Sequence, residues 1–114
     1  MTKSEATKHA NELLEQVKDV LKGAEIEVWE NLGWCFCVTS DYIKIHHNVK
    51  SNTYRTYISD RKDSSGALAM WDGDNLSDTP VGSICKALEI FHKFHHKMRM
   101  IERAVEDTVN YDSY

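Results

Sequence analysis

The sequence predicts a single α+β domain with an N-terminal helix, an antiparallel meander of four to five strands and a long C-terminal amphipathic helix. The apolar residues of the first 22 positions recur every three or four residues, those of residues 25 to 59 alternate, and those after residue 80 return to the helical spacing. A length of 114 residues, 41% of them hydrophobic, suits one domain with its own core. We therefore predict one domain over residues 1–108 and a frayed acidic tail over 109–114.

The first element is a helix from Ser4 to Lys22. Thr2 and Glu5 have the three-residue spacing of a capping box, which marks a helix start. Gly23 is a natural stop. One apolar stripe then faces the core, and it consists of Ala6, Ala10, Leu13, Val17, Val20 and Leu21.

The middle of the chain has the two-residue period of half-buried strands. Short polar segments separate the apolar runs, so antiparallel neighbours joined by hairpins are the simplest topology. A polar link over 61–66 leads to a short fifth strand over 67–71. The four main strands are predicted at Ile26 to Val28, Trp34 to Thr39, Ile43 to His47 and Thr53 to Ser59.

The last predicted element is a helix from Val81 to Thr108. Thr79 can cap it, and Pro80 suits its first position. A helix of that length measures about 40 Å at 1.5 Å per residue, whereas a compact domain of this size has a radius of gyration of only about 13 Å. We therefore expect its apolar stripe to overhang the sheet and bind a protein partner, most simply a second copy in a homodimer. The residues predicted to make this contact are Phe94, Met98, Ile101 and Val105.

Composition excludes several classes of protein. No apolar run approaches the roughly 18 residues of a membrane span, and no leader with a cleavage site begins the chain. We therefore expect a cytoplasmic protein with no membrane association, whose three cysteines are reduced thiols. The sequence contains no catalytic motif and no phosphate-cradling glycine loop, so we predict neither enzymatic activity nor a cofactor.

The net charge of −4 hides a basic segment over residues 41–62, which carries five bases and two acids. Aromatic and cationic side chains alternate there, as they do in surfaces that stack bases and neutralise phosphates. Strand periodicity divides the segment between two faces, with Tyr54 opposite Arg55 and Tyr57. An ordinary solvent face is the alternative interpretation. The candidate residues for a nucleotide or nucleic acid are Tyr42, Lys44, His46, Arg55, Tyr57, Lys93 and Lys97.

Histidines and cysteines form weak candidates for a metal site. His92 and His96 are four residues apart on a helix, where Glu89 could complete a set of ligands. His46 and His47 are adjacent on a strand and so point to opposite faces. Cys35 and Cys37 share the face opposite Trp34 and Phe36, and buried small residues are the simpler interpretation of this pair. We therefore predict no metal.

The favoured hypothesis is a non-enzymatic binding module that acts through protein contacts. In size, acidity and architecture the chain resembles the small inhibitors and accessory proteins that phages make against host machinery. Such a resemblance implies an inhibitory or accessory role. The alternatives are a nucleotide or nucleic-acid binder that uses residues 42–62 and a metal-binding protein that uses histidine and cysteine.

Overall fold

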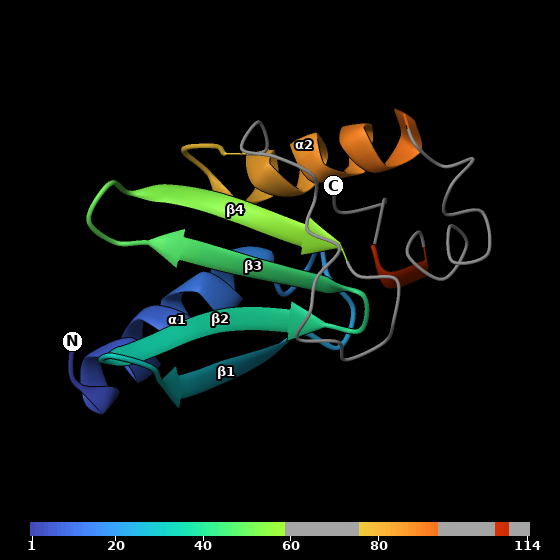
Figure 1. Cartoon of the computed structure of the whole chain (residues 1–114). Coiled ribbons are helices and arrows are strands. Elements are labelled where there is room, and N and C mark those ends of the chain that lie inside the picture. Colours follow the sequence, from blue (N-terminus) through green and yellow to red (C-terminus); the bar gives the residue numbers. More distant parts are fainter. Residues whose placement is uncertain (59–75, 94–106, 110–114) are drawn as a thin grey trace.

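A computed structural model describes residues 1–58, 76–93 and 107–109 (Figure 1). Its four strands form one antiparallel sheet in the order β1-β2-β3-β4. The α+β meander predicted from the sequence is confirmed. The elements in chain order are α1 (Lys3–Val17), β1 (Glu25–Glu30), β2 (Trp34–Ser40), β3 (Ile43–Asn48), β4 (Thr53–Ile58) and α2 (Pro80–Lys93).

Helix α1 begins at the predicted capping box. The Glu5 amide donates to Thr2 Oγ1 at 3.1 Å, and the Thr2 amide donates to Glu5 Oε1 at 2.9 Å. The helix ends at Val17, ahead of the predicted Lys22, and the chain turns at Gly23 with a φ of +66°. Leu21 remains fully buried because it forms a bridge with Val109 instead of extending the helix.

Both helices pack on one face of the sheet, α1 against β1 and β2, and α2 against β4 and β3. The other face, here called the outer face, carries the alternate side chains of every strand. This division confirms the predicted separation of Tyr54 from Arg55 and Tyr57 and of the two cysteines from Phe36. The fully buried sheet residues on the helix side are Val38, Ile43, Ile45, Thr56 and Ile58, and Phe36 and Tyr54 are nearly so.

The sheet consists of two complete hairpins joined by an incomplete seam. Six residue pairs connect β1 to β2, and six connect β3 to β4. Between β2 and β3 the pairing stops at Val38 and Ile45, after three pairs. Figure 1 shows the two strands close together at their shared turn and separating toward the opposite end. We call this separation the fork; it lies between residues 34–37 of β2 and residues 46–48 of β3.

Helix α2 starts as predicted. Thr79 Oγ1 accepts the Gly82 amide at 3.0 Å, and Pro80 is the first helical residue. Lys93 is the last residue of the described helix, so the predicted continuation from residue 94 lies outside the described residues until Asp107 and Thr108, which are helical. The fifth strand predicted over 67–71 also lies outside them.

Val109, predicted to belong to a frayed tail, is 2% exposed. It pairs with Leu21, and the Lys22 amide donates to the Thr108 carbonyl at 3.1 Å. Val109 is therefore part of the core, and residues 110–114 lie outside the described residues. Within the described parts of the chain, no helix is both long and apolar enough to cross a membrane.

Candidate functional site

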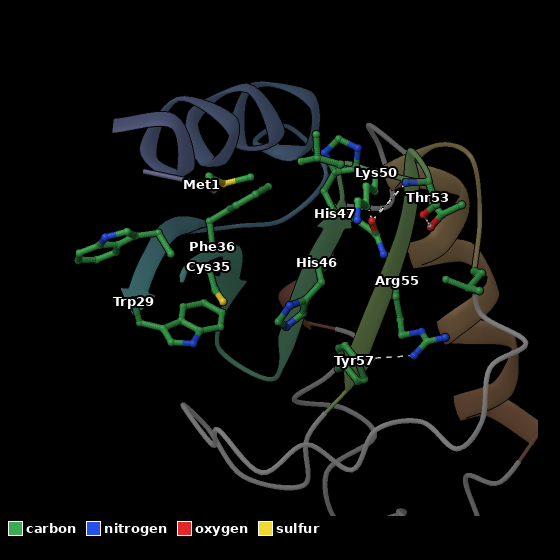
Figure 2. A pocket seen from close by; sticks show the side chains of 15 residues that line it. Met1, Trp29, Cys35, Phe36, His46, His47, Lys50, Thr53, Arg55 and Tyr57 are labelled. Atoms are coloured by element: carbon green, nitrogen blue, oxygen red, sulfur yellow. Dashed lines mark hydrogen bonds between the residues drawn. The ribbon is translucent and has the colours of Figure 1, made fainter. Parts of the chain in front are cut away.

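A pocket of about 770 Å³ opens at the fork between β2 and β3 (Figure 2). Its volume falls in the range of small-molecule sites, which is roughly 300–1,000 Å³. Cys35 and Phe36 line it from β2, and His46 and His47 line it from β3. We call it the fork pocket. Its remaining lining residues are Met1, Trp29, Trp34, Asn48, Val49, Lys50, Ser51, Thr53, Arg55, Tyr57 and Leu76.

The pocket forms because each hairpin is anchored to its own neighbours. On the helix side, Phe36 stacks on His9 of α1 with ring centroids 5.7 Å apart. His47 instead stacks on Tyr54 of β4, with centroids 4.1 Å apart and planes 7° from parallel. The Phe36 and His47 rings meet edge to face at 6.4 Å. Bulky rings therefore lie where the pairing of β2 with β3 would otherwise continue.

On the outer face, His46 lies between two aromatic rings. Its imidazole makes edge contacts with Trp29, at a centroid distance of 6.1 Å, and with Tyr57, at 5.1 Å. Burial lowers the pKa of His46, and the nearby cations Lys44 and Arg55 lower it further, while Glu27 acts in the opposite direction. The imidazole is therefore neutral at pH 7, with one nitrogen that donates and one that accepts.

The charged groups of the pocket are all cationic. Arg55 and Lys50 line it, and no acidic side chain is among its described lining residues. Lys44 behaves differently, because its ammonium lies 3.7 Å from a Glu27 carboxylate oxygen. Arg55 Nη1 contacts the Tyr57 hydroxyl at 3.5 Å, and its buried Nε has no hydrogen-bond partner among the described residues. Arg55 is thus a partly buried cation without an acidic partner in the described structure.

The turn between β3 and β4 is built to hold Lys50 and His47 in place. Asn48 Oδ1 accepts the amides of Lys50 and Ser51 at 3.1 and 3.2 Å. Asn52 takes the left-handed conformation at φ +53°, and its Oδ1 lies 3.0 Å from His47 Nε2. These contacts order the turn at the mouth of the pocket.

The two cysteines of β2 have different environments. Cys35 lines the pocket and is partly exposed. Cys37 is 1% exposed, and burial together with the Glu27 carboxylate raises the pKa of its thiol to about 12. Cys37 is therefore a protonated, packed thiol at neutral pH.

Part of the exposed lining of the pocket is apolar. Four large hydrophobic side chains are exposed among the described residues, and three of them, Met1, Val49 and Leu76, line the pocket. Leu76 is held there by its carbonyl oxygen, which accepts from Lys86 Nζ of α2 at 2.6 Å. A ligand in the pocket would therefore cover apolar as well as cationic surface.

Three of the residues predicted for a nucleotide come together in the pocket: His46, Arg55 and Tyr57. Lys44 shares their face but is paired with Glu27. Tyr42 lies in the turn after β2, where it packs against the core at the other end of the sheet. Lys93 ends α2, and Lys97 lies outside the described residues.

Sequence reasoning missed Trp29, Phe36 and Lys50 as pocket residues. The first two belong to the other hairpin, and their place beside His46 depends on how the two hairpins diverge. Lys50 lies in a loop, and the periodicity of the strands does not predict where a loop lies. The alternation of aromatic and cationic side chains in residues 42–57 is the feature of the sequence that indicated a site. It identified the pocket residues of β3 and β4 but not those of the other hairpin.

The other predicted sites lie partly or wholly outside the described chain. Glu89 is exposed and His92 partly buried on α2, while His96 is not described. Across residues 1–58, 76–93 and 107–109, no three metal-ligating side chains cluster. The predicted partner-binding residues Phe94, Met98, Ile101 and Val105 also lie outside the described residues.

Comparison of the chain with protein-family models, with curated proteins and with solved structures finds no match in any of the three.

Proposed function

We propose that this chain is a non-catalytic binding protein whose fork pocket holds a small organic anion with a flat ring, such as an aromatic phosphate or carboxylate. The observation that carries the proposal is that Arg55 is a partly buried cation with no acidic partner in the described structure. This residue lines the pocket, and its guanidinium has no acidic partner among the described residues.

A partly buried cation is unfavourable without a compensating charge or hydrogen bonds. Arg55 has one long contact, to the Tyr57 hydroxyl, and a buried Nε without a partner in the described structure. A phosphate or carboxylate matches the planar fork of a guanidinium and would satisfy it. Lys50, held at the rim by the Asn48 turn, adds a second positive charge.

The rest of the lining favours a ring system. Trp29, Trp34, Phe36 and Tyr57 contribute aromatic surface, and His46 adds an imidazole. Aromatic side chains bind flat ligands by stacked and edge-to-face contacts, each worth about 0.5–1.5 kcal/mol beyond the area that they bury. The combination of rings with cations that have no acidic partner in the described parts of the chain supports an aromatic anion rather than an aliphatic ligand.

The proposal is tested by calorimetric titration of the full chain with phenyl phosphate, benzoate, a nucleoside monophosphate and inorganic phosphate. We expect the aromatic anions to bind more tightly than inorganic phosphate. Arg55→Gln should weaken this binding about 10- to 100-fold, the usual worth of a charge-assisted hydrogen bond.

Lys44→Gln is the matched control, because Lys44 lies on the same face but is paired with Glu27 and does not line the pocket. It should leave the affinity unchanged. The absence of binding by every aromatic anion, or an equal loss in the two variants, would contradict the proposal.

A contact with a protein partner through the C-terminal segment is the second proposal. It is supported by the apolar spacing of Phe94, Met98, Ile101 and Val105 in the sequence. We expect Ile101→Asp to shift the assembly state to a smaller species in light scattering. A variant with the same mass in solution as the wild type would contradict an oligomer at this position.

A further inference from the structure

The fork leaves main-chain groups of two strands without partners in the sheet ladder. In a hairpin with a two-residue turn, the closing pair exchanges both main-chain hydrogen bonds, and every second pair repeats this. Ser40 and Ile43 close the turn at residues 41 and 42, and Val38 and Ile45 form the next such pair. The third would be Phe36 and His47, which lie beyond the end of the pairing.

The peptide groups of Phe36 and His47 therefore face each other across the fork as a donor and acceptor edge on each strand. Both residues line the pocket. A main-chain donor or acceptor that a bound ligand seals from water must find a new partner, because leaving it unsatisfied costs about 1–3 kcal/mol. A ligand that fills the fork needs hydrogen-bonding groups along its own edge.

His46 adds a third polar edge on the outer side of the pocket. The described contacts of its ring are made with Trp29 and Tyr57, and no hydrogen bond of its ring nitrogens is found among the described residues. Neutral imidazole offers one donor and one acceptor. The three groups belong to the same pocket as Arg55, which lies directly opposite His46 in the β3–β4 ladder.

We infer that the ring of the ligand is a nucleobase-type heterocycle, read by the main-chain edges of Phe36 and His47 and by the His46 imidazole, with its phosphate at Arg55. This inference rests on the proposed function and names the class of ligand. A plain benzene ring would bury the same main-chain groups. It would remove the hydrogen bonds that these groups make to water and offer none in return.

The test compares ligands that share a phosphate and differ in the ring. Purine and pyrimidine nucleoside monophosphates and phenyl phosphate are titrated into the full chain under one set of conditions. We expect at least one nucleotide to bind more than about tenfold more tightly than phenyl phosphate, which is what a single well-placed hydrogen bond provides.

Equal affinities for nucleotides and phenyl phosphate would overturn the heterocycle and leave the aromatic anion intact. A failure of all of these ligands would overturn both proposals. Binding of an acidic peptide with no binding of nucleotides would also overturn the inference, since an extended chain can use the same main-chain edges. A short single-stranded oligonucleotide is titrated in the same way. If it binds more tightly than the mononucleotide, the natural ligand is a nucleic acid and not a free nucleotide.

His46→Phe keeps a flat ring but removes both nitrogens. It should abolish the tenfold preference for the nucleotide and leave the affinity for phenyl phosphate within about twofold. His92→Phe, on α2 and not among the residues that line the pocket, is the control and should retain the preference.

Amide chemical shifts of the wild-type chain give a second readout that requires no variant. The amides of Phe36 and His47 should shift on nucleotide binding, whereas those of Ser40 and Ile43, which are paired in the same seam, should not. Unchanged shifts at Phe36 and His47 in the saturated complex would overturn main-chain reading.

Discussion

Arg55 lies directly opposite His46 in the β3–β4 ladder, and both side chains line the pocket at the fork. Burial lowers the pKa of His46 most, and the Arg55 guanidinium lowers it further, because a nearby positive charge disfavours a second one. The pair therefore combines a permanent cation with a neutral donor and acceptor. This combination suits a ligand with a charged end and a polar ring.

Cys35 should react with iodoacetamide much faster than Cys37 in the native protein at pH 8. The thiolate is the reactive form, and Cys37 is buried with a pKa of about 12. Peptide mass spectrometry after timed labelling measures both rates. A bound nucleotide should slow the labelling of Cys35, which lines the pocket, and leave that of Cys85 in α2 unchanged. Labelling of Cys37 as fast as that of Cys35 would show that this packing is wrong.

His46 should make the fold less stable as the pH falls below about 6.5. Its pKa in the folded chain is lowered from 6.5, so the unfolded chain takes up the proton first and is favoured by acid. Burial lowers this pKa most, Lys44 and Arg55 lower it further, and Glu27 acts in the opposite direction. Urea unfolding at about pH 7.5 and 5.5 measures the effect. In His46→Phe the loss of stability between these two pH values should be smaller, and an unchanged loss would refute the assignment.

Thr56→Val should lower the free energy of unfolding by about 1–2 kcal/mol. Its hydroxyl and that of Ser83 lie 2.7 Å apart in the buried interface between β4 and α2, and Ser83 also donates to the Pro80 carbonyl at 2.8 Å. Ser83→Ala removes the same contact, so the double variant should lose less than the sum of the two single variants. Thr53→Val removes a hydroxyl that lies 2.7 Å from Ser51 Oγ at a partly exposed site, where water can replace the contact, so it should change stability by less than about 0.5 kcal/mol. Fully additive losses at residues 56 and 83 would contradict the shared hydrogen bond.

Leu32→Asn should raise the free energy of unfolding by roughly 0.5–1 kcal/mol. Leu32 is fully exposed at the β1–β2 turn and takes a left-handed φ of +56°, which Asn adopts at lower cost. The opposite change at the next residue, Gly33→Ala, should lower stability because its φ is +122°. Urea unfolding of the two variants beside the wild type decides the matter. A destabilised Leu32→Asn would show that the exposed leucine stabilises the turn.

Local patterns were enough to predict most of the described fold. The capping box of Thr2 and Glu5 and the Thr79-Pro80 start of α2 satisfy their hydrogen bonds within a few residues, so their signals are complete in the sequence. The alternation of strand residues likewise predicted which face each side chain takes. The end of α1 was predicted too late, because Leu21 pairs with Val109, a residue far along the chain.

The sequence by itself determined the order of helices and strands, the two faces of the sheet and three residues of the pocket, His46, Arg55 and Tyr57. These follow from periodicity and from charge, which are properties of neighbouring residues. The tertiary structure alone decided that the pairing of β2 with β3 ends at Val38 and Ile45 and that Trp29 contacts His46. It also decided that Lys44 pairs with Glu27, whereas Arg55 has no acidic partner among the described residues. Such contacts depend on how far one hairpin lies from the next, and that distance is set by the rings and the helices packed against each strand.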